Sequence, residues 1–172
     1  MSSKIPRRLK HFSLFIDGQG YAGRVDELTL PKLTRKMDEF RAGGMNAPFE
    51  IDMGMEKLEA EFTLAEYNED VIKFWGVKNN AQLGLRFKGS IEADDGTAAV
   101  TAIEVILRGR WREVDMGNWK GGDSATMKVA VAVSYYKYSS KGEDLIEIDV
   151  LNLVEKVDGK DRLAEHRKAI GL

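Results

Sequence analysis

The two histidines are the side chains of this sequence best suited to acid–base catalysis or metal binding. His11 lies near the amino-terminal end and His166 near the carboxyl-terminal end, so either role would require the fold to bring them together with carboxylates. The chain has no cysteine, which excludes thiolate zinc sites, iron–sulfur clusters and cysteine nucleophiles. It also lacks a Walker-type phosphate loop and the G-x-S-x-G and H-E-x-x-H motifs. We therefore expect no catalytic residue, no bound metal and no cofactor.

Three arginines alternate along one predicted strand, where they could bind a phosphate backbone or pair with carboxylates. Arg108, Arg110 and Arg112 share a strand face, and Trp111 lies among them. Arginines beside aromatic residues are typical of surfaces that follow single-stranded nucleic acid. Arginines also form charge-assisted pairs with the carboxylates of a neighbouring strand or subunit, and the segment from Glu143 to Asp149 supplies them. We favour ion pairing and keep nucleic-acid binding as an alternative.

The composition favours a single soluble domain of balanced charge. The chain has 172 residues, with 26 basic and 28 acidic side chains and a formal net charge of -2. This length suits one domain, 1–172, and the charge lacks the basic excess of a dedicated nucleic-acid binder. A near-neutral subunit can also pack beside many copies of itself without accumulating charge. No stretch approaches the roughly 20 apolar residues of a membrane span, so we expect no membrane anchor.

Period-2 alternation of apolar and polar residues dominates the chain and predicts a mainly β domain. The clearest strands are 12–16, 58–64, 83–91, 101–107, 127–135 and 146–150. Only two segments are typical of helices. Asn68 is a plausible N-cap for a first helix whose buried face would hold Val71, Ile72 and Trp75, and Gly76 can end it. The second helix is expected at about 161–170.

Two long segments, 30–55 and 114–123, do not fit this alternation. The first is a long protruding loop in our interpretation, because it contains Pro31, Gly43, Gly44 and Pro48. Long loops in small domains are usually functional or disordered, and the apolar content of this one argues against disorder. Apolar side chains in a loop that cannot reach its own core indicate a second chain as partner. The stretch 33–41 is then either an exposed hairpin arm or, as we favour, a strand between subunits.

Four stretches in order along the chain resemble one family. They are 28–45, 52–54, 107–117 and 146–162, with 170–172 at the end. Together they are similar to the major tail tube proteins of contractile-tailed (myovirus) phages, and equally to the tube proteins of R-type bacteriocins derived from such tails. An ordered set that frames nearly the whole chain is more specific than any single short motif.

The resemblance implies a fold and an assembly. The expected fold is two packed antiparallel sheets, a sandwich or barrel, with one flanking helix and a short C-terminal helix. Related subunits form six-membered rings whose inner strands join into a continuous inner β-barrel, and the rings stack into a tube. The tube would conduct DNA without binding it tightly inside a contractile sheath, beside baseplate and tail terminator proteins. The location would be the virion tail, or a bacteriocin particle, assembled in the bacterial host cytoplasm.

Two contact surfaces follow as expectations from this assembly. Ring stacking should use apolar and glycine residues of the long loop: Leu30, Pro31, Leu33, Phe40, Gly43, Gly44, Met45, Phe49 and Met53. Lateral contacts within a ring should use Arg108, Arg110, Arg112, Glu147 and Asp149. The alternatives are a bacteriocin tube that perforates an envelope without carrying DNA, a nucleic-acid-binding β-domain, and a small β-barrel enzyme or ligand carrier, for which the sequence supplies no catalytic residues.

Overall fold

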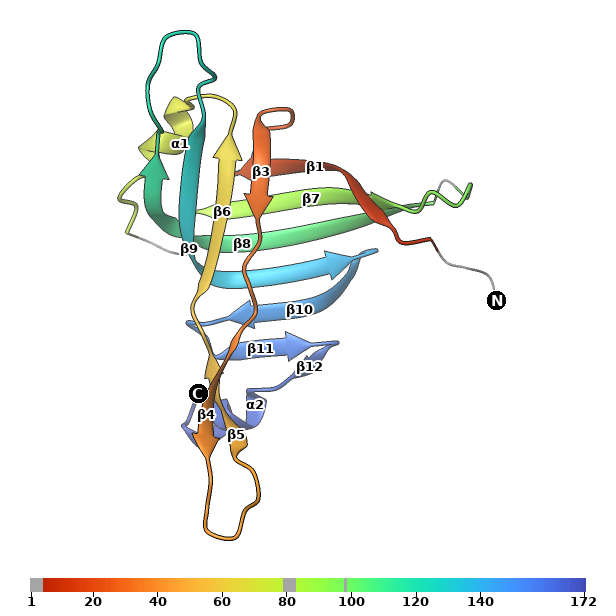
Figure 1. The fold of residues 1–172 in the computed structure, drawn as a ribbon, viewed down its shortest axis with the longest axis vertical. Coiled ribbons are helices and arrows are strands. Elements are labelled where there is room, and N and C mark those ends of the chain that lie inside the picture. The colour runs from red at the N-terminus through yellow and green to blue at the C-terminus, as the bar shows by residue number, and fades with distance from the viewer. Residues whose placement is uncertain (1–4, 79–82, 98) are drawn as a thin grey trace.

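The computed structural model describes residues 5–78, 83–97 and 99–172, which form a mainly β protein with a large antiparallel sheet, a two-stranded sheet and two short helices. Figure 1 shows the long strands β1, β7 and β8 running across the direction of β3 and β6. The strands are β1 (Arg8–Ile16), β2 (Gln19–Gly20), β3 (Val25–Thr29), β4 (Arg35–Phe40), β5 (Phe49–Met55), β6 (Leu58–Leu64), β7 (Gly84–Glu92), β8 (Val100–Asp115), β9 (Met127–Ser140), β10 (Glu143–Asp149), β11 (Val154–Val157) and β12 (Lys160–Asp161). The helices are α1 (Glu69–Lys73) and α2 (Ala164–Ala169).

Strand β9 divides the large sheet into two parts. Along its whole length it pairs with β8, but on its other edge its first half pairs with β6 and its second half with β10. One part therefore contains β3 and β6, and the other contains β1, β7 and β10 to β12 (Figure 1). The apolar faces of both parts contribute to one core, whose largest fully buried side chains include Phe62, Leu14 and Leu107. The expected two packed sheets are thus two parts of one hydrogen-bonded sheet, and the described residues form no closed barrel.

The change of direction in β8 lies at a glycine. The register of β8 with β9 shifts between Arg108 and Gly109, and again between Trp111 and Glu113. Such β-bulges bend a strand and increase its twist. A Cβ at Gly109 would overlap the carbonyl oxygen of Ala132 and lie 3.0 Å from its carbonyl carbon. The close approach of β9 to this position therefore requires glycine.

Replacing Gly109 with alanine should lower the free energy of unfolding by at least about 2 kcal/mol, because the Cβ meets backbone that cannot rotate away. Chemical denaturation followed by circular dichroism measures this. Gly84→Ala is the matched control: Gly84 lies opposite Arg108 in β7, and nothing lies within 4 Å of its Cβ position. We expect that control to stay within about 0.5 kcal/mol of the parent. Equal effects of both substitutions would contradict the close approach.

The first helix confirms the predicted cap and corrects one predicted contact. The Asn68 side chain accepts a hydrogen bond from the Val71 amide at 3.2 Å, and Gly76 follows the helix with a positive φ of 81°. Val71 is buried, but Trp75 is exposed and does not share its face as predicted. The reason is the short length of the helix. Because α1 ends at Lys73, Trp75 lies beyond its last turn and no longer follows the helical spacing that would place it beside Val71. Phe74 packs on the core in its place.

The segments 30–55 and 114–123, which do not follow the alternation of apolar and polar residues, are only partly loops. Most of 30–55 is a hairpin, because β4 and β5 pair in their own two-stranded sheet. Val114 and Asp115 continue β8, which leaves 116–126 as the loop. The helix α2 is shorter than predicted and buries no residue. Arg167 holds it by donating to Asp161 at 2.6 Å and to the Leu153 carbonyl at 2.7 Å. Within the described residues, no helix is long and apolar enough to cross a membrane.

Candidate assembly surfaces

The β4–β5 hairpin carries an apolar face that its own chain leaves uncovered. Phe40 lies directly opposite Phe49, and because side chains alternate along a strand, Ile51 and Met53 share the face of Phe49. The exposed fractions are 51% for Phe40, 61% for Phe49, 40% for Ile51 and 58% for Met53. Figure 1 shows the hairpin extending from one end of the molecule, away from the core. Exposed apolar surfaces of this kind are typical of contacts with another molecule.

The base of the hairpin is fixed to the large sheet by one arginine. Arg35 donates to Glu155, a buried carboxylate of β11, and lies 3.5 Å from Asp52 across the hairpin. A buried carboxylate requires such a partner. On the polar face farther along, Glu39 lies opposite Glu50, a like-charge pair that weakens the hairpin in the isolated chain. The hairpin is therefore anchored at its base and not optimised for stability toward its tip.

The structure divides the predicted stacking residues into three groups. Leu33, Phe40, Phe49 and Met53 are exposed on the hairpin or its approach. Gly43, Gly44 and Met45 lie in the connection between β4 and β5, where the Met45 sulfur accepts a hydrogen bond from the Ala42 amide. Pro31 is buried within its own chain, and Leu30 packs partly against the core.

Ile51 belongs to the same surface but is absent from the predicted set. The signal was present, because Phe49, Ile51, Met53 and Met55 alternate with polar residues. The glycines and prolines around this stretch favour a loop, but the structure forms the strand β5 there.

The predicted arginine strand presents its arginines outward and its tryptophan inward. Arg108 lies over the Tyr135 ring, 4.6 Å from its centroid, and Arg112 contacts Glu59 at 2.5 Å. Arg110 is exposed and forms no ion pair with any residue that the structure describes. Trp111 points into the core and donates to the Val71 carbonyl at 2.8 Å. It is therefore not available to stack on a base, which removes the main support for the nucleic-acid alternative.

The two predicted lateral carboxylates are bonded within their own chain. Glu147 accepts from the Tyr135 hydroxyl at 2.9 Å and lies 3.4 Å from the Lys156 ammonium. Burial, together with this bond to Glu147, raises the pKa of Tyr135 to about 12, so the phenol remains a donor at neutral pH. Asp149 accepts from the backbone and side-chain amides of Asn152. These residues lie in one area because β8, β9 and β10 are neighbours.

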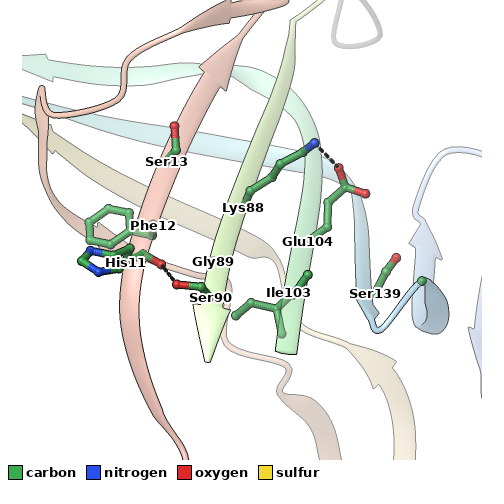
Figure 2. A pocket seen from close by; sticks show the side chains of 11 residues that line it. His11, Phe12, Ser13, Lys88, Gly89, Ser90, Ile103, Glu104 and Ser139 are labelled. Carbon is green, nitrogen blue, oxygen red and sulfur yellow. Dashed lines mark hydrogen bonds and ion pairs between the residues drawn. The ribbon is translucent and has the colours of Figure 1, made fainter. Parts of the chain in front are cut away.

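The face of β1, β7, β8 and β9 that points away from the core carries small and polar side chains. A shallow hollow of about 500 Å³ lies over it, lined largely by small side chains such as Ser13, Ser90, Ala102 and Ser139. Figure 2 shows the Lys88 ammonium beside Glu104, at 4.0 Å, and the Ser90 hydroxyl donating to the His11 backbone carbonyl. The His11 ring takes no part in that bond. The polar side chains here do not form a nucleophile–base pair.

On this polar face, acidic side chains form ion pairs with basic side chains of the neighbouring strand. Glu104 also contacts Arg86 at 3.2 Å, and Asp144 contacts Lys137 at 3.0 Å. Hydrogen bonds from Ser139 and then Lys137 hold the pKa of Asp144 below its ordinary value, so this carboxylate stays ionised at neutral pH. The result is a surface with many charges and little unbalanced charge. No cluster of three or more potential metal ligands occurs among the described residues.

Comparisons with known proteins assign this sequence to a family. Residues 6–171 match the family described as Phage tail tube protein FII. The tail tube protein of Escherichia phage P2 is 39% identical over 171 residues, covering 98% of this chain and 99% of the relative. The major tail tube protein of Serratia phage KSP20 is 36% identical over 159 residues, covering 91% of each chain.

Two solved structures share the fold at low sequence identity. One is the sheath–tube complex of an extracellular contractile injection system, with a TM-score of 0.56, 10% identity and coverage of 75% of this chain and 88% of that chain. The other is the tube-terminating cap of the anti-feeding prophage, with a TM-score of 0.62, 8% identity and coverage of 81% and 95%. At such identities the likeness concerns the fold alone.

Proposed function

This chain belongs to the phage tail tube protein FII family, and from this premise we propose that it builds the inner tube of a contractile tail as stacked six-membered rings. Membership makes it a structural, non-enzymatic tail tube protein of a contractile phage tail or a related injection system. The ring number, the stacking and the inner barrel are the proposed part. The observation that carries them is one face of the hairpin with four exposed apolar side chains, which a tube of repeated subunits would cover.

The hairpin is the proposed ring-stacking element. The exposed apolar side chains of its stacking face are Phe40, Phe49, Ile51 and Met53. Leu33 lies just before β4, and Gly43, Gly44 and Met45 form the connection. About half of Phe40 and Phe49 remains accessible, so covering the pair contributes on the order of 2 kcal/mol per subunit. A ring repeats this contact once for every copy, and a modest contact thereby becomes a strong one. Leu30 and Pro31 act within their own chain by supporting the start of the hairpin.

The proposed lateral contact joins neighbouring large sheets in a ring. Strand pairing around a ring removes exposed strand edges and closes a continuous inner β-barrel. Arg108, Arg110, Arg112, Glu147 and Asp149 are the proposed polar contacts beside this junction. Arg110 supports the proposal best, because it is exposed and the described residues give it no ion pair. The other four residues already have partners in their own chain. We expect them to contribute to the lateral contact by packing more than by new ion pairs.

The polar face of β1, β7, β8 and β9 is the proposed wall of the lumen. Small side chains and paired charges suit a conduit for DNA, because tight phosphate binding requires unpaired cations. A bacteriocin tube that carries no DNA would accept the same surface and is the second candidate. The two solved neighbours are described as a sheath–tube complex and a tube-terminating cap. We accordingly propose a tail sheath protein, a baseplate and a tail terminator as partners, and the virion tail as location.

Electron microscopy of the purified chain at rising concentration tests the assembly. We expect rings and then hollow tubes of uniform diameter, because head-to-tail contacts repeat without limit along an axis. Sedimentation should show the loss of monomer over the same concentration range. A chain that stays monomeric throughout, also with polyethylene glycol added to promote association, would contradict the proposal.

A further inference from the structure

A half-open apolar groove lies where β3 crosses the core face of the large sheet. Its volume is about 290 Å³. One wall is formed by Leu28 and Leu30, in and just after β3, and the other by apolar side chains of β1, β7 and β8: Leu9, Phe12, Phe87, Ile103 and Val105. Leu9 is 53% exposed, so this wall continues the core to the surface. Figure 1 shows β3 crossing the direction of β1, β7 and β8, with β6 beside it.

The rim of the groove carries two exposed carboxylates. Asp26 and Glu27 lie on β3 at its opening. Neither belongs to an ion pair formed by the residues that the structure describes. Most other carboxylates on the large sheet have a basic partner, as Glu59, Glu61 and Glu104 do. The Glu27 charge also acts on the Lys128 ammonium, but that lysine already forms an ion pair with Glu61 at 3.0 Å. The rim therefore keeps a net negative charge, and an apolar groove with such a rim fits an apolar segment that is flanked by a cation.

The tip of the hairpin has the complementary chemistry. Phe40 and Phe49 are cross-strand neighbours that present their rings on one side, and the exposed Arg41 follows Phe40 directly. Arg41 also forms no ion pair among the described residues. A cavity of roughly 150 Å³ lined by aliphatic side chains binds one benzene, so a groove about twice that size fits a pair of phenyl rings.

We propose that this groove receives the Phe40–Phe49 pair of a neighbouring copy, with Arg41 of that copy facing Asp26 and Glu27. The inference rests on the proposed tube function and deepens it by naming the acceptor of the hairpin. The hairpin extends from one end of the molecule (Figure 1), whereas the residues that line the groove belong to β1, β3, β7 and β8 of the large sheet or follow β3 directly. The contact is therefore between two different surfaces, and such head-to-tail contacts propagate when they do not close on themselves.

Chemical cross-linking tests the contact directly, because the native chain has no cysteine. The variant Arg41→Cys with Glu27→Cys should give a ladder of covalent oligomers when assembled tubes are treated with a short bis-maleimide reagent. Its matched control, Arg41→Cys with Asp123→Cys, places the second thiol on the exposed loop after β8 and should give no ladder. Tubes of the first variant without a ladder, or a ladder from the control, would overturn the groove as acceptor and leave the tube itself in place.

Charge reversal gives a second readout. Arg41→Glu should raise the concentration for half-assembly at least tenfold, and Asp26→Lys with Glu27→Lys should do the same. Combining all three substitutions should restore assembly to within about threefold of the parent chain, because the ion pairs re-form with opposite sign. Failure of the combination to recover, while the parent forms tubes, would overturn the proposed pairing. Failure of the parent itself to form tubes would instead contradict the proposed function.

Discussion

Replacing Phe40 and Phe49 together with threonine should give a folded subunit that no longer forms long tubes. Both rings are more than half exposed, so the core loses no contact and the free energy of unfolding should change by less than about 1 kcal/mol. Threonine keeps the β-propensity of the hairpin, and Arg35 still fixes its base to Glu155. The loss in each stacking contact is on the order of 2 kcal/mol, multiplied by the number of copies in a ring. Negative-stain microscopy and sedimentation measure assembly, and circular dichroism measures folding.

Met37→Thr is the matched control for this pair. Met37 is 44% exposed on the same hairpin, but it lies opposite Asp52 and belongs to the polar face. We expect it to assemble at the concentration of the parent chain. Normal tubes from the double variant would show that the apolar face is not the stacking surface, and an unfolded double variant would show that the hairpin supports the core.

Replacing Trp111 with alanine should destabilise the subunit by about 3–5 kcal/mol, the range for deleting a large buried aromatic side chain. Trp111 is only 5% exposed. Its ring meets Phe62 and Phe74 edge-on, at centroid distances of 5.5 Å and 6.3 Å. Its indole nitrogen donates to the Val71 carbonyl at 2.8 Å, so the substitution also removes one buried hydrogen bond and leaves that carbonyl only its bond from the Phe74 amide at 3.3 Å. Urea denaturation followed by circular dichroism gives the change directly.

An exposed tryptophan, Trp119, provides the comparison. Trp119 is 76% exposed and stacks on Tyr67 at a centroid distance of 5.6 Å. Trp119→Ala should stay within about 0.5 kcal/mol of the parent chain. Trp111→Phe should fall between the two, because it keeps most of the packing and loses the indole donor. If Trp111→Ala were as stable as Trp119→Ala, the assignment of Trp111 to the centre of the core would be wrong.

The positions of most long strands followed from local pattern. The alternation of 58–64 is the strand β6 without change of bounds, and 127–135 is the first part of β9. Asn68 capped its helix because a side-chain acceptor next to an acidic first turn is a local arrangement. The apolar content of the hairpin also followed from the sequence, since Phe40, Phe49 and Met53 lie among charged residues in a segment rich in glycine and proline.

The functional surfaces were harder to predict, because they depend on which strands become neighbours. Arg108 and Glu147 belong to one area only through β9, which brings Tyr135 beside both. The groove beside β3 is formed by residues of four segments that are far apart in the sequence. Pro31 suggested an exposed loop, yet it is buried because the chain crosses the core there before the hairpin begins. The sequence pattern indicates which side chains alternate along a strand. It does not indicate which segments, distant in the sequence, pack over those side chains.

The sequence by itself determined that this protein is mainly β, lacks cysteine and the common catalytic motifs, and carries apolar side chains in a segment rich in charges, glycine and proline. These properties depend on residue type and on spacing over a few positions, where backbone geometry fixes the period. Only the tertiary structure decided that one sheet folds into two parts at Gly109, that Trp111 turns inward while its arginine neighbours turn outward, and that the hairpin lies away from the groove. Those outcomes depend on contacts between residues far apart in the chain, and no local period encodes them.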